Sequence, residues 1–123
     1  WAMALGVPVL RGDICLVNLE PVRPGEANKR RPAVIVSNDG ANAMAHRLGA
    51  GVVTVVPVTT NVSRVYPFQV LLPTGETGLH RESKAQAEQV RSVAVSRVST
   101  KVGSVPVETM QRLDDALRLH LGL

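Results

Sequence analysis

The sequence is poor in aromatic residues and in cysteine. Tryptophan, tyrosine and phenylalanine each occur once in 123 residues, so the core must consist of aliphatic side chains, and surfaces on which nucleobases could stack are scarce. The single cysteine, Cys15, excludes an internal disulfide and a cysteine-rich metal site. We expect Cys15 to occupy a half-buried strand position and the protein to be cytoplasmic, because reduced thiols are typical of that compartment.

The sequence also lacks long apolar runs and the motifs of common cofactor enzymes. Residues 1–10 are apolar but too few to span a membrane, and they contain no basic segment of the kind found in signal peptides. The three histidines have no spacing typical of a metal site, and neither a glycine-rich phosphate loop nor an H-E-x-x-H motif occurs. We therefore expect no membrane contact, no metal and no cofactor. We interpret residues 1–10 as an arm or a cloning remnant ahead of one domain at residues 11–123.

Positive charge is in excess and is unevenly distributed. The chain has 14 lysines and arginines against 10 acidic residues, which gives a net charge of +4. Residues 23–31 contain four cations and one acid, residues 81–101 contain five cations and two acids, and the C-terminal segment is slightly acidic. Concentrated basicity favours contact with a polyanion such as an RNA backbone, although a solvated cationic loop without function has the same composition.

Short β-branched runs separated by proline and glycine predict a small sheet. Five or six such runs occur at short intervals, which is the spacing of a small barrel rather than of alternating strands and helices. The runs cover residues 14–19, 32–37, 51–61 and 66–73, with one or two more within 84–95. Because side chains alternate along a strand, Thr59 and Thr60 should leave it on opposite faces.

The C-terminal residues follow a different period. Apolar side chains recur every three or four positions, as in an amphipathic helix that begins near Pro106. They are Val107, Met110, Leu113, Leu117 and Leu121. Residues 38–49 predict no more than a short helical turn, because they are largely polar. The predicted fold class is therefore mainly β (α+β): a small β-barrel of five to seven strands with a C-terminal amphipathic helix.

Arg31 differs from the other cations of its loop. It directly precedes Pro32 and a buried strand, which should hold its side chain while the neighbouring cations move freely. A fixed guanidinium can bind a phosphate through two parallel hydrogen bonds. A structural salt bridge with Glu88 or Asp39 is an equally good interpretation from composition alone.

Four motifs occur in order along the chain and carry a family resemblance. They are RGDICLVNLEP at residues 11–21, KRRPAVIVSND at 29–39, VVPVTTN at 55–61 and AEQVRSV at 87–93, and the tail VGSVP…ETMQRLDDALRLHLGL follows them. From about Arg11 to its end, the chain resembles the MazF/PemK/Kid family of toxin endoribonucleases from bacterial toxin–antitoxin pairs. The resemblance implies an SH3-like barrel, a homodimer and metal-independent, sequence-specific cleavage of single-stranded RNA. It also implies a MazE-like antitoxin whose disordered tail occupies the RNA groove.

The resemblance also implies the site residues. The family's catalytic arginine falls on Arg31 and its threonine or serine on Thr59, and the residues of the late motif fall on Glu88, Gln89 and Arg91. Some members use a histidine in the first loop. Gly25 stands where that residue would align, which leaves the general base open.

The reaction that follows from these residues uses the nucleophile that RNA carries. Attack of the ribose 2′-hydroxyl on the adjacent phosphorus is intramolecular and yields a 2′,3′-cyclic phosphate and a 5′-hydroxyl. Arg31 would neutralise charge on the phosphoryl oxygens, and Thr59 would hold one of them by a hydrogen bond. Glu88 is the candidate base for the 2′-hydroxyl, with a salt bridge to Arg31 or Arg91 as the alternative role.

Amide side chains can both donate to and accept from an unstacked base, so Asn28, Asn38 and Gln89 are predicted to read base edges. The predicted RNA-binding residues are Glu26, Asn28, Lys29, Arg30, Ser37, Asn38, Arg64, Gln89 and Arg91. Two alternative functions remain. Relatives of the CcdB type share the barrel but poison DNA gyrase by binding it, chiefly through the terminal helix. A non-catalytic barrel would bind RNA with a steep salt dependence and leave it uncut.

Overall fold

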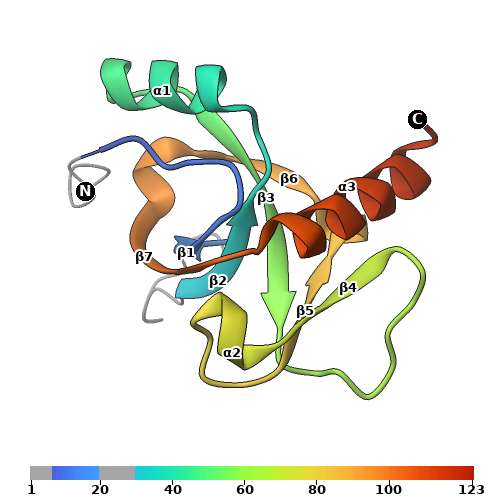
Figure 1. The fold of residues 1–123 in the computed structure, drawn as a ribbon. Coiled ribbons are helices and arrows are strands. Elements are labelled where there is room, and N and C mark those ends of the chain that lie inside the picture. Colours follow the sequence, from blue (N-terminus) through green and yellow to red (C-terminus); the bar gives the residue numbers. More distant parts are fainter. Residues whose placement is uncertain (1–6, 20–29) are drawn as a thin grey trace, which may run out of the picture.

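The computed structural model describes residues 7–19 and 30–123, which form one antiparallel sheet and three α-helices (Figure 1). The strands are β1 (Asp13–Asn18), β2 (Arg30–Ile35), β3 (Val52–Thr59), β4 (Gln69–Leu72), β5 (Ser83–Gln86), β6 (Arg91–Ala94) and β7 (Val98–Ser104). The helices are α1 (Asp39–Leu48), α2 (Thr74–Thr77) and α3 (Val107–Leu121), and short 3₁₀ turns cover Ala87–Gln89 and Val95–Arg97. The prediction of a mainly β fold with a C-terminal helix is confirmed.

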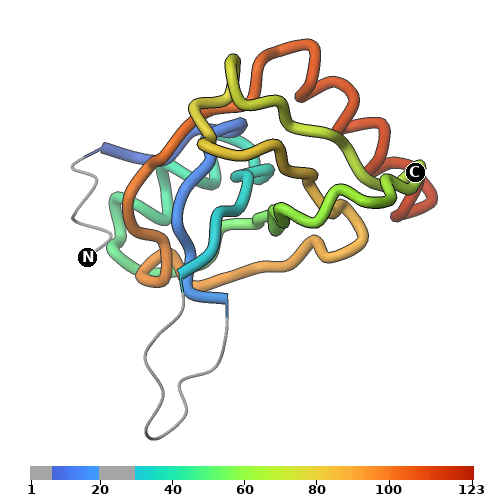
Figure 2. The backbone as a smooth tube through the Cα atoms, turned by 90° about the horizontal axis from the view of Figure 1, so that it is seen from below, coloured from blue at the N-terminus to red at the C-terminus, as the bar shows by residue number. Residues whose placement is uncertain are grey.

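The strand order is β4-β5-β3-β2-β1-β7, and β6 pairs with β3. β3 is central because its first half, residues 52–55, pairs with β6, whereas Val58 and Thr59 pair with β5. β4 and β7 are the two ends of this order and do not pair with each other, so the sheet of the predicted small barrel is not closed. Helix α3 follows β7 and packs against β4, so a helix rather than a strand pairing spans the two sheet edges (Figure 1, Figure 2).

The alternation of β3 divides the apolar interior into two clusters on opposite faces of the sheet. Val56 and Val58 belong to one cluster, together with Met110 and Leu113 of α3. Val53 and Val55 belong to the other, together with Ala45 of α1 and residues of β1, β2 and β6. Both faces of β3 are therefore buried, which explains why its sequence is an almost continuous apolar run.

The two longer helices differ from their predictions. Residues 39–48 form a full ten-residue helix rather than a short turn, because the Asn38 side chain caps it by accepting a hydrogen bond of 2.8 Å from the Ala41 N–H. In α3 the predicted apolar stripe is only partly buried. Val107 is 76% exposed and Leu121 53% exposed, whereas Thr109 and Ala116 are buried. Within the described residues, no helix has the length and apolarity needed to cross a membrane.

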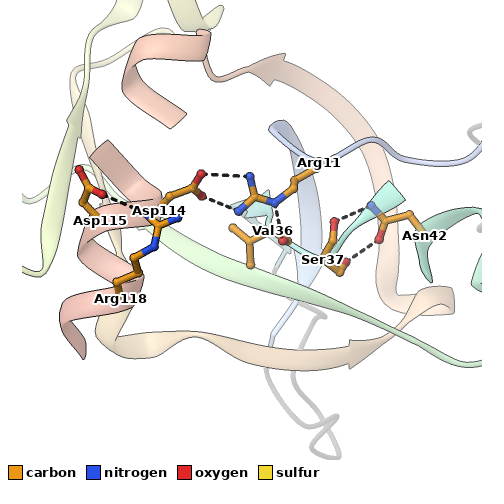
Figure 3. Close-up of polar contacts among 7 residues, drawn as sticks. All are labelled: Arg11, Val36, Ser37, Asn42, Asp114, Asp115 and Arg118. Atoms are coloured by element: carbon orange, nitrogen blue, oxygen red, sulfur yellow. Dashed lines mark hydrogen bonds and ion pairs between the residues drawn. The ribbon is translucent and has the colours of Figure 1, made fainter. Parts of the chain in front are cut away.

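Arg11 connects three elements on the side of the sheet near α1 (Figure 3). Its guanidinium forms an ion pair with Asp114 of α3 and donates to the carbonyl of Val36, just after β2. Its backbone N–H donates to the Asp39 carboxylate at the start of α1, at 2.7 Å. The Asp39 carboxylate therefore accepts from Arg11. The salt bridge between Asp39 and Arg31, one of the alternatives drawn from the sequence, is not among the ion pairs of the described residues.

Cys15 lies in β1 and is fully buried, more deeply than its sequence context predicts. Burial, with a smaller contribution from the nearby Asp13 carboxylate, raises the pKa of the Cys15 thiol to about 12 from an ordinary value of 9.0. The thiol is therefore protonated and shielded in the native protein, and it should be chemically inert.

We expect Cys15 to react with a thiol reagent at pH 8 only when the protein unfolds. The unfolded thiol ionises near pH 9, whereas the native thiol keeps its proton up to about pH 12, so the unfolded state is favoured increasingly as pH rises through this range. The Cys15→Ala variant should lack this part of the pH dependence. Urea unfolding of the native protein and of Cys15→Ala at several pH values measures this difference. If the two proteins lose the same stability above pH 9, the Cys15 thiol does not contribute to the pH dependence.

Candidate active site

Arg31 and Thr59, the two residues with the strongest predicted roles, lie at adjacent strand ends. The β2–β3 pairing ends with Ala33 opposite Pro57. Arg31 precedes Ala33 by two residues and Thr59 follows Pro57 by two, so in an antiparallel pair the two residues lie at the same end. Both residues line a pocket of about 330 Å³, which we call the Arg31–Thr59 pocket. The remaining lining residues are Pro32, Pro57, Val58, Thr60, Ser83 and Gln86.

The polar groups of the two residues are available to a ligand. Arg31 is exposed, and no partner holds its guanidinium within residues 7–19 and 30–123, so its five N–H donors can point at an anion. The Thr59 hydroxyl oxygen accepts a hydrogen bond of 3.2 Å from the Asn61 N–H. No acceptor takes the hydrogen of this hydroxyl in the part of the chain that the structure describes, so it can donate to an anionic oxygen in the pocket.

Thr60 also lines the pocket, although alternation predicted that it would leave on the opposite face from Thr59. β3 ends at Thr59, so the strand periodicity no longer applies one residue later. The prediction extended the strand too far.

Glu88, the candidate base, is outside the pocket. It lies in the 3₁₀ turn after β5, and its Oε2 accepts a hydrogen bond of 2.7 Å from Gln69 Nε2 of β4. Its Oε1 is buried without a hydrogen-bond partner in the described part of the chain. The structure therefore joins Glu88 to β4 and not to Arg31 or Thr59, and no ion pair connects it to Arg31 or Arg91 among those resolved.

The other cations and amides predicted to bind RNA have separate positions. Arg30 is exposed at the start of β2, beside Asn18 of β1, and Gln89 is exposed in its turn. Arg91 Nη1 donates to the Leu19 carbonyl at 2.8 Å and so ties β6 to the end of β1. Arg64 lies in the segment between β3 and β4.

Ser37 and Asn38 follow the C-terminal end of β2, whereas Arg31 lies at its N-terminal end. At about 3.3 Å per residue of strand, Ser37 is about 20 Å from Arg31. Asn38 caps α1. The Ser37 hydroxyl donates to Asn42 Oδ1 and accepts from the Thr54 N–H at 3.0 Å (Figure 3). Their side chains hold the β2–α1 junction and do not belong to the Arg31–Thr59 pocket. Glu26, Asn28 and Lys29 lie outside the described residues.

Sequence reasoning missed several residues of this region. Gln86 lines the pocket, and Lys84 lies directly opposite Thr59 in the β3–β5 pairing. A second pocket of about 280 Å³ adjoins the first, since both are lined by Pro32, Thr60 and Ser83. His80 and Arg81 line this second pocket. The sequence signal for all of them is weak, because a four-residue strand and a turn carry no distinctive period.

The donor set of the described residues does not suggest a metal centre. No three side chains of His, Cys, Asp or Glu gather as a metal site would require within this part of the chain. The side chains that line the pocket offer a guanidinium (Arg31), the hydroxyls of Thr59, Thr60 and Ser83, and an amide (Gln86).

Comparisons with known proteins show the family of this chain. A family model described as the PemK-like, MazF-like toxin of type II toxin–antitoxin systems matches residues 10–121. The Mycobacterium tuberculosis protein named endoribonuclease MazF9 is 58% identical over 113 residues, which cover 92% of this chain and 96% of the relative. Endoribonuclease EndoA of Bacillus subtilis is 28% identical over 94% of this chain and 96% of its own length.

A solved structure supports the same relationship. An endoribonuclease in complex with its cognate antitoxin, from Mycobacterial species, has a TM-score of 0.70 and 25% identity over 94% of this chain and 96% of that chain. The resemblance inferred from the four motifs is thereby confirmed. The chain belongs to the PemK-like, MazF-like toxin family of type II toxin–antitoxin systems.

Proposed function

We propose that this protein is a sequence-specific endoribonuclease that cleaves single-stranded RNA as the toxin of a toxin–antitoxin pair. One observation carries the proposal: the Arg31 guanidinium, which no partner holds within residues 7–19 and 30–123, lines the same pocket as the Thr59 hydroxyl. Binding of one phosphodiester by both groups requires this arrangement. Relatives named as endoribonucleases match nearly the whole chain. We also propose that a cognate antitoxin neutralises the protein by covering the RNA groove with a disordered tail, and that the toxin acts as a cytoplasmic homodimer.

The proposed reaction needs neither a metal nor an added nucleophile. The 2′-oxygen attacks phosphorus as its proton passes to water, the bond from phosphorus to the 5′-oxygen breaks, and that oxygen takes a proton from water. Negative charge grows on the non-bridging oxygens during this step. Two parallel donors from Arg31 and the O–H of Thr59 stabilise it more in the transition state than in the ground state.

Arg31 and Thr59 have different roles in this proposal. The guanidinium supplies charge and a planar fork that matches two phosphoryl oxygens. The threonine hydroxyl supplies one directed hydrogen bond and, being on a strand end, keeps a constant position. We leave Glu88 out of the proposed step because Gln69 already holds its carboxylate and it does not line the pocket.

An RNA lacking one hydroxyl tests the cyclising route. Total RNA is first incubated with the protein in chelator, and the 5′ ends of the fragments give the cleavage site. A short RNA containing this site should be cut in chelator to a 2′,3′-cyclic phosphate and a 5′-hydroxyl end. Replacing the 2′-hydroxyl of the scissile nucleotide by hydrogen should abolish cutting, since the nucleophile is gone. Continued cutting of the deoxy substrate would exclude the route, and uncut RNA in every condition would exclude the proposed activity.

A further inference from the structure

Two of the three aromatic residues of this chain meet in the segment between β3 and β4. The rings of Tyr66 and Phe68 are stacked, with centroids 5.3 Å apart and an angle of 4° between their planes. The Arg64 guanidinium lies 5.6 Å from the centre of the Tyr66 ring, and its Nη1 is 3.3 Å from the tyrosine hydroxyl. Residues 7–19 and 30–123 contain no other phenylalanine, tyrosine or tryptophan, so in this part of the chain the stack of a guanidinium and two rings is the natural place for a base to stack.

The stack is not part of the apolar core. Tyr66 is 41% exposed, and neither aromatic residue belongs to the two core clusters. Val65 and Pro67, between the stacked residues, instead line a hollow against α3. Tyr66 and Phe68 do not line this hollow, so neither the contact with the helix nor the packing of the core explains their stack.

Two buried polar side chains hold the backbone of this segment in place. Lys84 is only 7% exposed, and its Nζ donates to the Arg64 carbonyl at 2.5 Å. Gln69 is 8% exposed, and its Oε1 accepts from the Tyr66 N–H at 3.1 Å. These two hydrogen bonds fix the backbone from which the Tyr66 ring extends. A binding surface that is formed before its ligand arrives needs such support.

The same lysine places the stack near the Arg31–Thr59 pocket. Lys84 is directly opposite Thr59 in the β3–β5 pairing, with side chains about 5 Å apart at their base. The Lys84 side chain therefore extends from the strand position opposite Thr59 to the Arg64 carbonyl. An RNA strand with a phosphate in the pocket would need only a few nucleotides to bring a base to Tyr66.

We propose that Tyr66, supported by Phe68 and Arg64, stacks on a base of single-stranded RNA whose scissile phosphate occupies the Arg31–Thr59 pocket. This inference rests on the proposed function and adds the group that recognises unpaired bases. Single-stranded RNA exposes base faces that a duplex hides, and proteins bind them by stacking on aromatic rings and on arginine. A stacking contact accepts every base, so it selects for single strands rather than for a sequence.

The test compares two single-stranded probes that carry the same charge. One is a fluorescent decamer of deoxyuridine, which lacks the 2′-hydroxyl and is not cut by the proposed route, and the other is an abasic decamer with the same sugar-phosphate backbone. Native protein, Tyr66→Leu and Tyr66→Phe are titrated with both at one fixed salt concentration, and thermal unfolding verifies that each variant is folded. The native protein should bind the deoxyuridine probe at least about fivefold more tightly than the abasic probe.

Tyr66→Leu should lose this preference and bind the abasic probe as the native protein does, whereas Tyr66→Phe should keep the preference because its ring remains. A native preference that Tyr66→Leu retains would overturn the inference, as would an equal loss of affinity for both probes. RNA cleavage by the native protein is measured separately. Loss of cleavage with an intact Tyr66 preference would refute the proposed function alone, whereas normal cleavage without the preference would refute the stacking role alone.

Discussion

Replacing Arg31 with alanine is expected to slow RNA cleavage by at least about a hundredfold while leaving the fold intact. The loss follows from removing a donor aimed at charge that develops on the phosphate, an effect of about 10²–10³ in well-studied enzymes. The side chain is exposed and makes no contact that holds the sheet together within the described residues, so stability should change little. Single-turnover cleavage of a defined RNA and urea unfolding measure the two quantities.

Arg47→Ala is the matched control, because Arg47 is an exposed arginine on α1 and its loss changes net charge equally. It should cut RNA at close to the native rate. Arg31→Lys retains the charge but not the planar fork, and an intermediate rate is expected. Native-like cleavage by Arg31→Ala, or an equal loss in Arg47→Ala, would show that general electrostatic attraction and not a placed guanidinium accounts for activity.

Gly103→Ala is expected to destabilise the protein by about 3 kcal/mol. A Cβ atom built on Gly103 in β7 would lie 2.0 Å from the carbonyl oxygen of Thr77 and 3.1 Å from its carbonyl carbon. Both are backbone atoms of α2, which cannot rotate away as a flexible side chain can. The added methyl group must therefore force α2 and β7 apart, and α2 leads into the residues that line the second pocket.

Gly75→Ala is the control for Gly103→Ala. Gly75 lies in α2 itself, and a Cβ at this position would meet nothing within 4 Å. Its replacement should be neutral or slightly stabilising, because alanine restricts the unfolded chain more than glycine does. Urea midpoints of the two variants measure the difference. If Gly103→Ala unfolds at the native midpoint, the close approach of β7 to α2 is not a constraint on the fold.

Local patterns predicted the elements well where a single period ran through them. The β-branched run predicted at residues 14–19 corresponds to β1 (Asp13–Asn18), and the amphipathic stripe corresponds to α3 (Val107–Leu121). Propensity and periodicity are properties of neighbouring residues, so the sequence carries them directly. Helix α1 was underestimated because its stability comes from the Asn38 cap and from docking of Ala45 on the sheet, which polarity alone does not reveal.

The site was predictable only in part. Motifs identified Arg31 and Thr59, and the β2–β3 register brings them into one pocket. The same motifs also contain Asn38 and Glu88, which the fold engages elsewhere, in a helix cap and in a hydrogen bond to Gln69. Membership of a motif does not distinguish a side chain that faces the ligand from one that holds the backbone, since both can be required at a fixed position.

The sequence by itself determined the aliphatic core, the mainly β fold with its C-terminal helix and the family, and it singled out Arg31 and Thr59 as candidates for binding a phosphate. Only the tertiary structure decided that the sheet stays open, that Lys84 lies beside Thr59 and that Lys84 holds the Arg64 carbonyl. These features depend on pairings between residues far apart in the chain. Their energies come from register and packing, which no local period encodes.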